Sequence, residues 1–330
     1  MDLSTNYLGL KLKNPLVPSA SPFSENLDNI KIMEESGASA VVFHSLFEEQ
    51  IINEAENFHH HITFGTESFV EATSFFPEPQ DFHIGIENYL ANLTKAKETV
   101  SIPVIASLNC KSLGSWTDFA KEIEKTGVDA LELNIYNIPT NFDLSPQYIE
   151  DSYLNIIKKI RSEINIPIAV KLSPYFNNMA YMAKKISEAG ANGLVLFNRF
   201  YQPDIDIETL KMKTTLSLST SVENRLSLTW IGILYDNITA DLAATSGIHK
   251  TEDVIKLIMA GANVTMMCSA LLKNGIPYLK IIEKELKEWL EEHEYHSLKQ
   301  MHGSMSKKKS HDGKAFEREQ YIHTIQNFSN

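Results

Sequence analysis

The 330 residues predict an α/β protein, a (β/α)8 TIM barrel with an insertion after its second strand and a C-terminal helical extension. The first observation is a weak internal repeat, in which a glycine able to end a helix precedes an apolar residue, a small polar residue and an apolar strand. The repeat begins at Gly37, Gly127, Gly190 and Gly261. The second is its spacing, because 63 and 71 residues separate the last three glycines, about two βα units of ~30 residues each.

Two further strands begin at Ile-Pro pairs, at Ile102 and Ile166, which lie between the glycine repeats. Proline is tolerated at the first residue of a strand, so these pairs mark strand starts. A doubly wound sheet, the rival fold, needs a glycine-rich turn after its first strand, and the sequence contains no GxGxxG. We place the eight strands at 16–19, 40–43, 104–107, 130–134, 169–172, 194–198, 240–244 and 264–268.

The 90 residues between Gly37 and Gly127 leave ~25 residues beyond two βα units, and we place this insertion at about 48–82. The expected organisation is a barrel over 1–300, followed by a linker and a C-terminal helix over 301–330. Outside the eight strands we expect short strands at 3–7 and 10–12, a strand-like segment at 226–231, and helices at 26–36, 252–259, 276–293 and 315–328.

Composition limits the class of partner. The formal net charge of −12 argues against nucleic acid or an anionic membrane surface. No stretch reaches the ~20 apolar residues that span a bilayer. Two cysteines, Cys110 and Cys268, suit a reducing cytoplasm better than a disulfide framework. We expect a cytoplasmic protein that acts on a small-molecule substrate, with a homodimer as the default assembly.

Two small-residue turns follow the last two predicted strands, Ala-Thr-Ser-Gly at 244–247 and Cys-Ser-Ala at 268–270. Small residues let backbone N–H groups approach an anion, and a helix N-terminus after the turn adds partial positive charge. Either turn alone could be a tight turn and no more. As a pair after strands 7 and 8, they match the phosphate site of a (β/α)8 barrel.

The loops after the strands share one rim, where such barrels carry their catalytic residues. Lys171 is the only lysine that our assignment places at a strand end. It could form a salt bridge inside the barrel, act as a Schiff-base nucleophile, or hold a fixed positive charge beside a cofactor. The other rim residues are mostly amides and hydroxyls: Ala20, Ser21, His44, Ser45, Ser107, Asn109, Asn134, Asn137, Asn198, Ser246, Gly247, Cys268 and Ser269.

Asn134 and Asn198 lie on alternate strands and could read the hydrogen-bonding edge of a planar heterocycle. Water in the barrel could satisfy the same amides. Arg199 directly follows Asn198 and could bind a carboxylate, whereas Arg225 has Glu223 nearby as an ion-pair partner.

Six segments of the barrel follow one another in a specific order: Ser19-Ala-Ser, Glu132-Leu-Asn-Ile, Val170-Lys-Leu-Ser-Pro-Tyr-Phe, Asn198, Ala244-Thr-Ser-Gly-Ile and Cys268-Ser-Ala-Leu. Together they resemble the dihydroorotate dehydrogenase family, from about residue 4 to residue 295. The resemblance implies an FMN-dependent oxidoreductase that moves a hydride from a dihydropyrimidine carbon to the flavin while a base removes the neighbouring proton. The family reaction converts dihydroorotate to orotate in pyrimidine biosynthesis.

The resemblance also implies positions for FMN and substrate. The residues implied for FMN are Ala20, Ser21, Ser45, Ser107 and Asn134 along the ring, Lys171 beside its pyrimidine end, Asn198 facing flavin and substrate, and Ser246, Gly247, Cys268 and Ser269 at the phosphate. The resemblance implies Asn134 and Asn198 as substrate contacts, and Arg199, from its position after Asn198, is the third that we expect.

The sequence departs from the family pattern in three places. Asn137 stands where the family has a cysteine or serine base, and a neutral amide cannot usefully accept a proton. His44 replaces a lysine after strand 2. It could serve as the base, because the ordinary pKa of histidine is near neutrality, or be a hydrogen-bonded structural residue. The segment 71–79 replaces an asparagine- and glycine-rich substrate loop.

The insertion holds His59, His60 and His61 among glutamates. Three adjacent histidines cannot all face one ion from a strand, so we expect a solvated loop and no metal. The phenylalanines of the insertion suggest a lid over the flavin or a subunit contact.

We therefore expect an FMN-dependent dehydrogenase that acts on a CH–CH donor. Two alternatives remain. One is a family member with another substrate or with no catalysis, and the other is a phosphate-binding lyase or aldolase barrel with Lys171 as Schiff-base nucleophile. The sequence does not identify the molecule that reoxidises the flavin.

Overall fold

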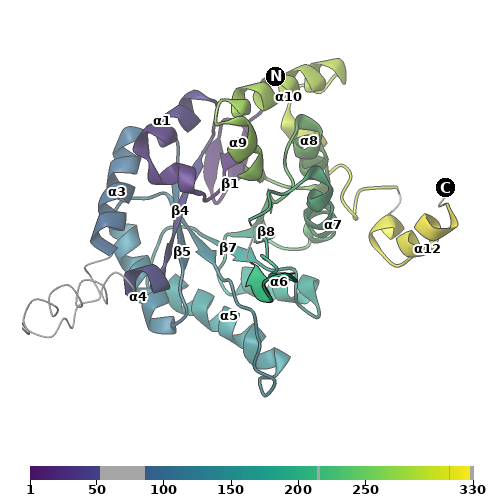
Figure 1. Cartoon of the computed structure of the whole chain (residues 1–330). Coiled ribbons are helices and arrows are strands. Elements are labelled where there is room, and N and C mark those ends of the chain that lie inside the picture. Colours follow the sequence, from purple (N-terminus) through teal and green to yellow (C-terminus); the bar gives the residue numbers. More distant parts are fainter. Residues whose placement is uncertain (53–85, 214–215, 312, 328–330) are drawn as a thin grey trace, which may run out of the picture.

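The computed structural model describes residues 1–52, 86–213, 216–311 and 313–327. Eight parallel strands curl into a barrel with helices around its outside (Figure 1). Their order is β3-β12-β11-β8-β7-β6-β5-β4, and the ends of this order meet where the Ser39 N–H donates to the Leu16 carbonyl at 3.0 Å. The strands are β3 (Leu16–Pro18), β4 (Val41–Phe47), β5 (Val104–Asn109), β6 (Ala130–Asn134), β7 (Ile168–Leu172), β8 (Gly193–Leu196), β11 (Asp241–Thr245) and β12 (Val264–Met267). The predicted (β/α)8 barrel is confirmed.

Strand register places the polar residues of the rim beside one another. Ser45 on β4 lies opposite Ser107 on β5, after an irregularity in β4 between Val42 and Ser45. Ser107 in turn lies opposite Glu132 on β6. Asn134, two residues further along β6, lies opposite Lys171 on β7. Because alternate residues of a strand face the same side, this register gathers hydroxyl, carboxylate, amide and ammonium groups at one level of the barrel.

The barrel has two hydrophobic layers. Its inside is filled by small and branched residues of the strands, and a hairpin of β1 (Thr5–Tyr7) and β2 (Leu10–Leu12) packs Tyr7, Leu8 and Leu12 into the same interior cluster. A larger layer lies between strands and helices, with Trp116 fully buried in it. A barrel whose interior is filled in this way is a packed core, and its chemistry is left to the rim.

The helices begin and end at the residues that the sequence signals indicate. Ser112, Ser145 and Asn178 accept backbone N–H bonds at helix N-termini, and Gly261 ends a helix with φ of 122°. The helices are α1 (Leu27–Glu35), α3 (Ile86–Thr99), α4 (Leu113–Lys125), α5 (Pro146–Arg161), α6 (Met179–Glu188), α7 (Asn224–Leu234), α8 (Thr251–Ala260), α9 (Ser269–Asn274), α10 (Tyr278–Glu292), α11 (Leu298–Met301) and α12 (Glu319–Gln326).

One predicted element was wrong. The segment 226–231 is part of helix α7 rather than a strand. Ser227, Ile231 and Leu234 are buried at helical spacing, and α7 packs against α8 and β11. A short apolar run does not distinguish a strand from a buried helix by its pattern alone, so tertiary packing decided the outcome.

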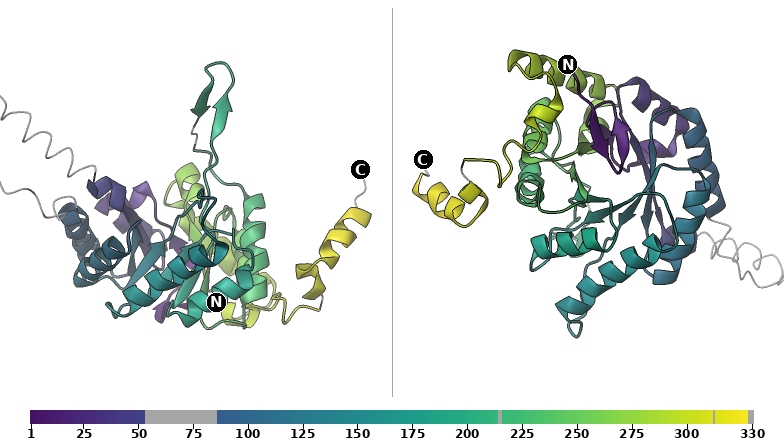
Figure 2. Two further views of the ribbon diagram at one scale, coloured as in Figure 1. Left: turned by 90° about the horizontal axis from the view of Figure 1, so that it is seen from below. Right: turned by 180° about the vertical axis from the view of Figure 1, so that it is seen from behind.

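Two segments stand away from the barrel (Figure 2). The connection from β8 to α7 carries a hairpin of β9 (Asp204–Asp206) and β10 (Lys211–Lys213), which projects from the body. At the C-terminus, α12 lies clear of the barrel, whereas the chain before it bonds to barrel helices, for example from the Lys307 N–H to the Gly232 carbonyl at 2.9 Å. The domain division at residue 300 stays a prediction. Within the described ranges, no helix combines the length and apolar character needed to cross a bilayer.

Three partly buried histidines make stability depend on pH. Burial lowers the pKa of His44, His249 and His302 below the ordinary value of 6.5. The unfolded chain therefore binds protons at these positions before the folded protein does, and the free energy of unfolding falls as the pH drops below 6.5. We expect a lower urea midpoint at pH 5.5 than at pH 7.5.

The control for this pH effect is a pair of histidine variants. In His302→Gln, the side-chain amide can keep the bond that the imidazole makes with the Gly261 carbonyl at 3.1 Å, but it does not titrate. This variant should show a smaller difference between the two midpoints, whereas the exposed His311→Gln should match the wild type. A midpoint that is equal or higher at pH 5.5 contradicts the assignment.

Candidate active site

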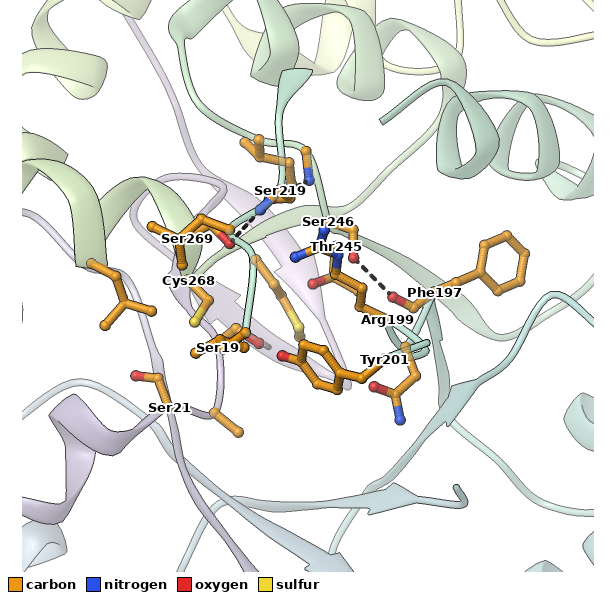
Figure 3. Close-up of a pocket in the computed structure, with 18 of the residues that line it drawn as sticks. Ser19, Ser21, Phe197, Arg199, Tyr201, Ser219, Thr245, Ser246, Cys268 and Ser269 are labelled. Atoms are coloured by element: carbon orange, nitrogen blue, oxygen red, sulfur yellow. Dashed lines mark hydrogen bonds between the residues drawn. The ribbon is translucent and has the colours of Figure 1, made fainter. Parts of the chain in front are cut away.

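A cavity of about 360 Å³ opens at the C-terminal rim of the barrel (Figure 3). This volume is within the range of sites that hold small molecules and cofactors. The predicted site residues that line it are Ala20, Ser21, Lys171, Asn198, Arg199, Ser246, Gly247, Cys268 and Ser269. The predicted residues that lie outside its lining are His44, Ser45, Ser107, Asn134 and Asn137.

The turn after β11 is shaped for a close approach of backbone. Ser246 and Gly247 both have left-handed φ angles, of 70° and 72°. A Cβ atom on Gly247 would lie 2.4 Å from the Asn224 backbone nitrogen and 2.8 Å from the Thr220 carbonyl oxygen, so only glycine fits there. The Ser246 hydroxyl is held by the Phe197 carbonyl at 3.2 Å. These contacts fix the conformation of the turn, which lines one side of the cavity.

Ser219 is a site residue that the sequence did not reveal. Its hydroxyl accepts the Gly247 N–H at 3.3 Å and lies 3.1 Å from His249 Nε2, and its own N–H donates to the Ser269 hydroxyl at 3.2 Å. It thus links the two turns that were predicted to hold a phosphate (Figure 3). Ser219 lies outside the strands and helices, and the only signal for it is the hydroxyl-rich run 217–221.

The N-terminus of α8 differs from the expectation. Its first turn was predicted to add positive charge to the phosphate site, but that turn carries Asp253. The Asp253 carboxylate accepts the N–H groups of His249 and Lys250, just before the helix, at 3.0 and 3.1 Å. The Asn224 amide also donates to this carboxylate at 2.8 Å. The anion-binding potential of this region therefore lies in the hydroxyls and the turn, because a side chain already neutralises the helix end.

Lys171 is the first of four polar residues in successive contact inside the barrel, followed by Glu132, Ser107 and Ser45. Its ammonium lies 3.7 Å from Glu132 Oε1, and the Ser107 hydroxyl donates to the same oxygen at 3.3 Å. Ser107 lies 2.8 Å from the Ser45 hydroxyl. The Glu132 side chain is fully buried, and its second oxygen has no partner among the described residues. Glu132 was missed as a site residue because it precedes the strand end by two positions.

The two predicted amides pair with each other. Asn198 Nδ2 donates to Asn134 Oδ1 at 2.5 Å. An asparagine has two N–H donors and one carbonyl oxygen, so this pair keeps free donors on Asn134 and a free acceptor on Asn198. The prediction that these amides read the edge of a heterocycle is compatible with this arrangement.

The dihydroorotate dehydrogenase family model matches residues 77–290 of the chain. The chain belongs to the dihydroorotate dehydrogenase family. It is 28% identical to a dihydroorotate dehydrogenase B (NAD(+)) catalytic subunit of Thermoplasma volcanium over 316 residues, which cover 92% of the chain and 98% of the relative. Proteins of the same name from Methanocaldococcus jannaschii and Bacillus thuringiensis are 26% and 25% identical, over 88% and 94% of the chain and 94% and 98% of those relatives.

Dihydroorotate dehydrogenases are FMN-dependent oxidoreductases that act on a CH–CH donor, which confirms the predicted enzyme class and cofactor. The polar groups that line the cavity are of the kinds that bind the phosphate and the ring of FMN. Hydroxyls of Ser219, Ser246 and Ser269 surround a glycine turn that a Cβ would close, and the Lys171 ammonium supplies positive charge. Hydroxyl and backbone groups of this kind bind a phosphate, and a cation stabilises the negative charge that a flavin ring gains on reduction.

Arg199, which was predicted to bind a substrate carboxylate, has partners within the protein. One guanidinium nitrogen lies 3.0 Å from Glu223 Oε1, and another donates to the Ser217 carbonyl. The prediction that Arg225 would pair with Glu223 was therefore wrong, because Arg199 occupies that carboxylate. Sequence distance gave no sign of the contact between Arg199 and Glu223.

Asn137, at the position of the family base, and His44, the alternative base, both lie outside the lining of the cavity. Asn137 is exposed and lines a separate cavity of about 440 Å³. The His44 ring packs against Phe43 and Tyr89, with ring centroids 4.4 and 5.1 Å apart, and its Nδ1 has no partner among the described residues. Burial lowers the pKa of His44, opposed in part by Glu25. The triple-histidine segment 59–61 and segment 71–79 lie outside the described residues.

Proposed function

We propose that this protein uses FMN in the rim cavity to oxidise a cyclic dihydropyrimidine, the dihydroorotate dehydrogenase type of reaction in pyrimidine biosynthesis. The observation that carries this proposal is the single cavity that contains both Lys171 on β7 and the Gly247 turn after β11. FMN, when bound, supplies the two-electron acceptor for a hydride. The relatives from Thermoplasma, Methanocaldococcus and Bacillus are named for dihydroorotate and NAD(+).

We assign the phosphate of FMN to the turns joined by Ser219. The Ser246, Gly247 and Ser269 backbone and hydroxyl groups would hold it, beside Cys268. Lys171 would stand beside the pyrimidine end of the ring, where a cation stabilises negative charge. The residues proposed along the rest of the ring are Ala20, Ser21, Ser45, Ser107, Asn134 and Asn198. Their hydroxyls and amides would orient the ring.

The ion pair with Glu132 supports a fixed cation at Lys171 over a Schiff-base nucleophile. A Schiff-base lysine must present an unengaged amine to its carbonyl substrate, whereas Lys171 Nζ lies 3.7 Å from Glu132 Oε1. The lyase alternative predicts that borohydride traps a carbonyl substrate on Lys171, and we expect no such adduct by mass spectrometry.

We propose His44 as the base that removes the substrate proton. Asn137 cannot take this role as an amide, and burial raises the pKa of the Cys268 thiol, which leaves it protonated. The lowered pKa of His44 leaves a neutral imidazole at pH 7. Its present position outside the cavity does not disqualify it, because catalytic contacts often tighten only when substrate binds.

His44→Gln should therefore slow flavin reduction by about 100-fold or more, the usual contribution of general base catalysis. In the wild type, the rate should be independent of pH above 7 and fall at lower pH, because protonation removes the base. Stopped-flow absorbance at several pH values measures both. An unchanged rate in His44→Gln, or a rate that rises towards acid, assigns the proton to another group.

The first test of the function is the visible absorption spectrum of the purified protein, recorded anaerobically before and after a dihydropyrimidine is added. A flavin band that bleaches supports the proposal. A colourless protein that takes up no added FMN excludes it. A flavin band that no dihydropyrimidine bleaches would favour a family member that has lost catalysis or uses another substrate. The cytoplasmic location, the homodimer and the absence of a nucleic-acid partner stay predictions.

A further inference from the structure

We infer that His249 takes up a proton when the FMN phosphate binds, and that it thereby turns the Ser219 hydroxyl towards the phosphate. His249 does not line the cavity, so it is a positioning residue that acts through Ser219. This role deepens the proposed function and rests on the assignment of the phosphate to the turns joined by Ser219. It follows from the single proton of the Ser219 hydroxyl and from the neighbours that compete for it.

Ser219 carries the hydroxyl that contacts both the cavity and His249. It lines the cavity beside Ser246 and Ser269, and only 6% of it is exposed (Figure 3). Its oxygen accepts the Gly247 N–H at 3.3 Å and lies 3.1 Å from His249 Nε2. A hydroxyl has one proton to donate and two lone pairs that accept. With one lone pair engaged by Gly247, the proton points either at His249 or at a ligand in the cavity.

The protonation of His249 decides between these two orientations. When Nε2 carries no proton, it accepts the hydroxyl proton of Ser219, and a phosphate would meet only oxygen lone pairs. When Nε2 carries a proton, it donates to the Ser219 oxygen, so the hydroxyl proton is released towards the cavity. The neutral tautomer with a proton on Nε2 gives the same orientation, but only the imidazolium adds the positive charge that a phosphate favours.

Several elements packed around His249 contribute titratable groups. These groups are Asp253 on α8, Glu223 just before α7, Lys273 on α9, Tyr278 on α10, whose hydroxyl donates to the His249 carbonyl at 3.0 Å, and the adjacent Lys250. Burial has the largest effect and lowers the pKa of His249, and Lys273 lowers it further, whereas Asp253, Glu223 and the Ser219 backbone raise it. Without a phosphate, the imidazole is therefore neutral at pH 7.

A bound phosphate reverses this preference. A phosphate monoester carries close to two negative charges above pH 7, because its second pKa is about 6. An opposite charge within about 6 Å favours the charged form of a histidine. Lys250 and Lys273 are exposed, so water screens their charges, whereas His249 is partly buried and lies within hydrogen-bond distance of Ser219. Phosphate binding at this turn therefore favours a proton on His249.

Isothermal titration calorimetry counts this proton. FMN is titrated into the flavin-free full-length protein at pH 7.5, in buffers that differ in their enthalpy of ionisation. We expect the wild type to take up at least about 0.3 proton per FMN, and linkage then requires FMN affinity to fall at least about twofold from pH 7.0 to pH 8.5. Riboflavin has the same ring without the phosphate, so its binding should take up no proton. No uptake with FMN, or equal uptake with both ligands, overturns the inference.

Two histidine variants assign the proton. In His249→Gln the side chain can still donate to Ser219, but it does not titrate, so FMN binding should take up no proton and its affinity should not depend on pH between 7.0 and 8.5. The matched control is His302→Gln, which removes another partly buried histidine, one that bonds to the Gly261 carbonyl and does not line the cavity. It should keep the wild-type uptake. Uptake that persists in His249→Gln assigns the proton to another group and overturns the inference.

A double-mutant cycle tests whether His249 acts through Ser219. His249→Ala should weaken FMN binding at least about fivefold in the wild type, but less than about twofold when Ser219 is also replaced by Ala, because the hydroxyl that it orients is then missing. Calorimetry at pH 7.5 measures the four affinities. An equal loss in the two backgrounds contradicts the positioning role.

Inorganic phosphate is the probe if the protein takes up no FMN, a result under which the proposed function fails. NMR titration of the protein labelled with 13C-histidine gives the pKa of each imidazole in phosphate and in chloride at equal ionic strength. Phosphate should raise the pKa of His249 and leave that of His302 unchanged. An unchanged pKa at His249, or equal rises at both histidines, overturns the inference.

Discussion

Replacing Lys171 with Met is expected to lower the free energy of unfolding by about 3–5 kcal/mol, because it leaves a buried charge without its partner. Glu132 is fully buried, and Lys171 is its ion-pair partner, with only 10% of the lysine side chain exposed. The same variant should slow flavin reduction by about 10²–10³, the usual loss for one preorganised electrostatic contact. Urea unfolding and stopped-flow absorbance measure the two effects.

A double variant separates the structural effect from the chemical one. In Lys171→Met with Glu132→Gln, no buried charge remains unpaired, so stability should return to within about 1–2 kcal/mol of the wild type. Flavin reduction should stay slow, since the cation is still missing. Recovery of the rate together with stability would show that Lys171 acts only as half of a structural ion pair.

Replacing Gly247 with Ala should lower the free energy of unfolding by about 2–5 kcal/mol and weaken FMN binding at least 100-fold. The backbone at this position has φ of 72°, which costs an ordinary residue about 1–2 kcal/mol. The new Cβ would also meet the Asn224 nitrogen at 2.4 Å, and overpacking of this kind costs about 1–3 kcal/mol. Any shift that relieves the clash moves the turn that we assign to the phosphate.

The matched control is Gly127→Ala. Gly127 has φ of 79°, but a Cβ there would meet nothing within 4 Å. This variant should show only the conformational cost of about 1–2 kcal/mol and wild-type affinity for FMN. Denaturation and fluorescence titration with FMN give both quantities. If Gly247→Ala binds FMN as tightly as Gly127→Ala does, the phosphate assignment is wrong.

The strand positions and part of the cavity lining were accessible from sequence because they depend on local chemistry. Glycines such as Gly127 end helices, proline at Ile102-Pro103 starts a strand, and strand ends of a (β/α)8 barrel meet at one rim. These rules alone placed Lys171 and Gly247 on the same rim, and both line the cavity. The same approach failed for segment 226–231. Its apolar run is too short to show whether the hydrophobic residues repeat with the period of a helix or of a strand.

Contacts between distant side chains could not be predicted in this way. Ser219 contacts Gly247 across 28 residues, and Arg199 rather than Arg225 pairs with Glu223, because only the tertiary structure brings these side chains together. Glu132 became a site residue only through the register of β5, β6 and β7. No local pattern encodes such contacts.

The sequence by itself determined the barrel, the family and the rim on which chemistry can occur, because helix ends, strand starts and small-residue turns are properties of neighbouring residues. The tertiary structure decided which of the rim residues share one cavity and which cations are already paired. Ion pairs such as Lys171 with Glu132 form between separate strands, so their existence depends on strand register and loop path.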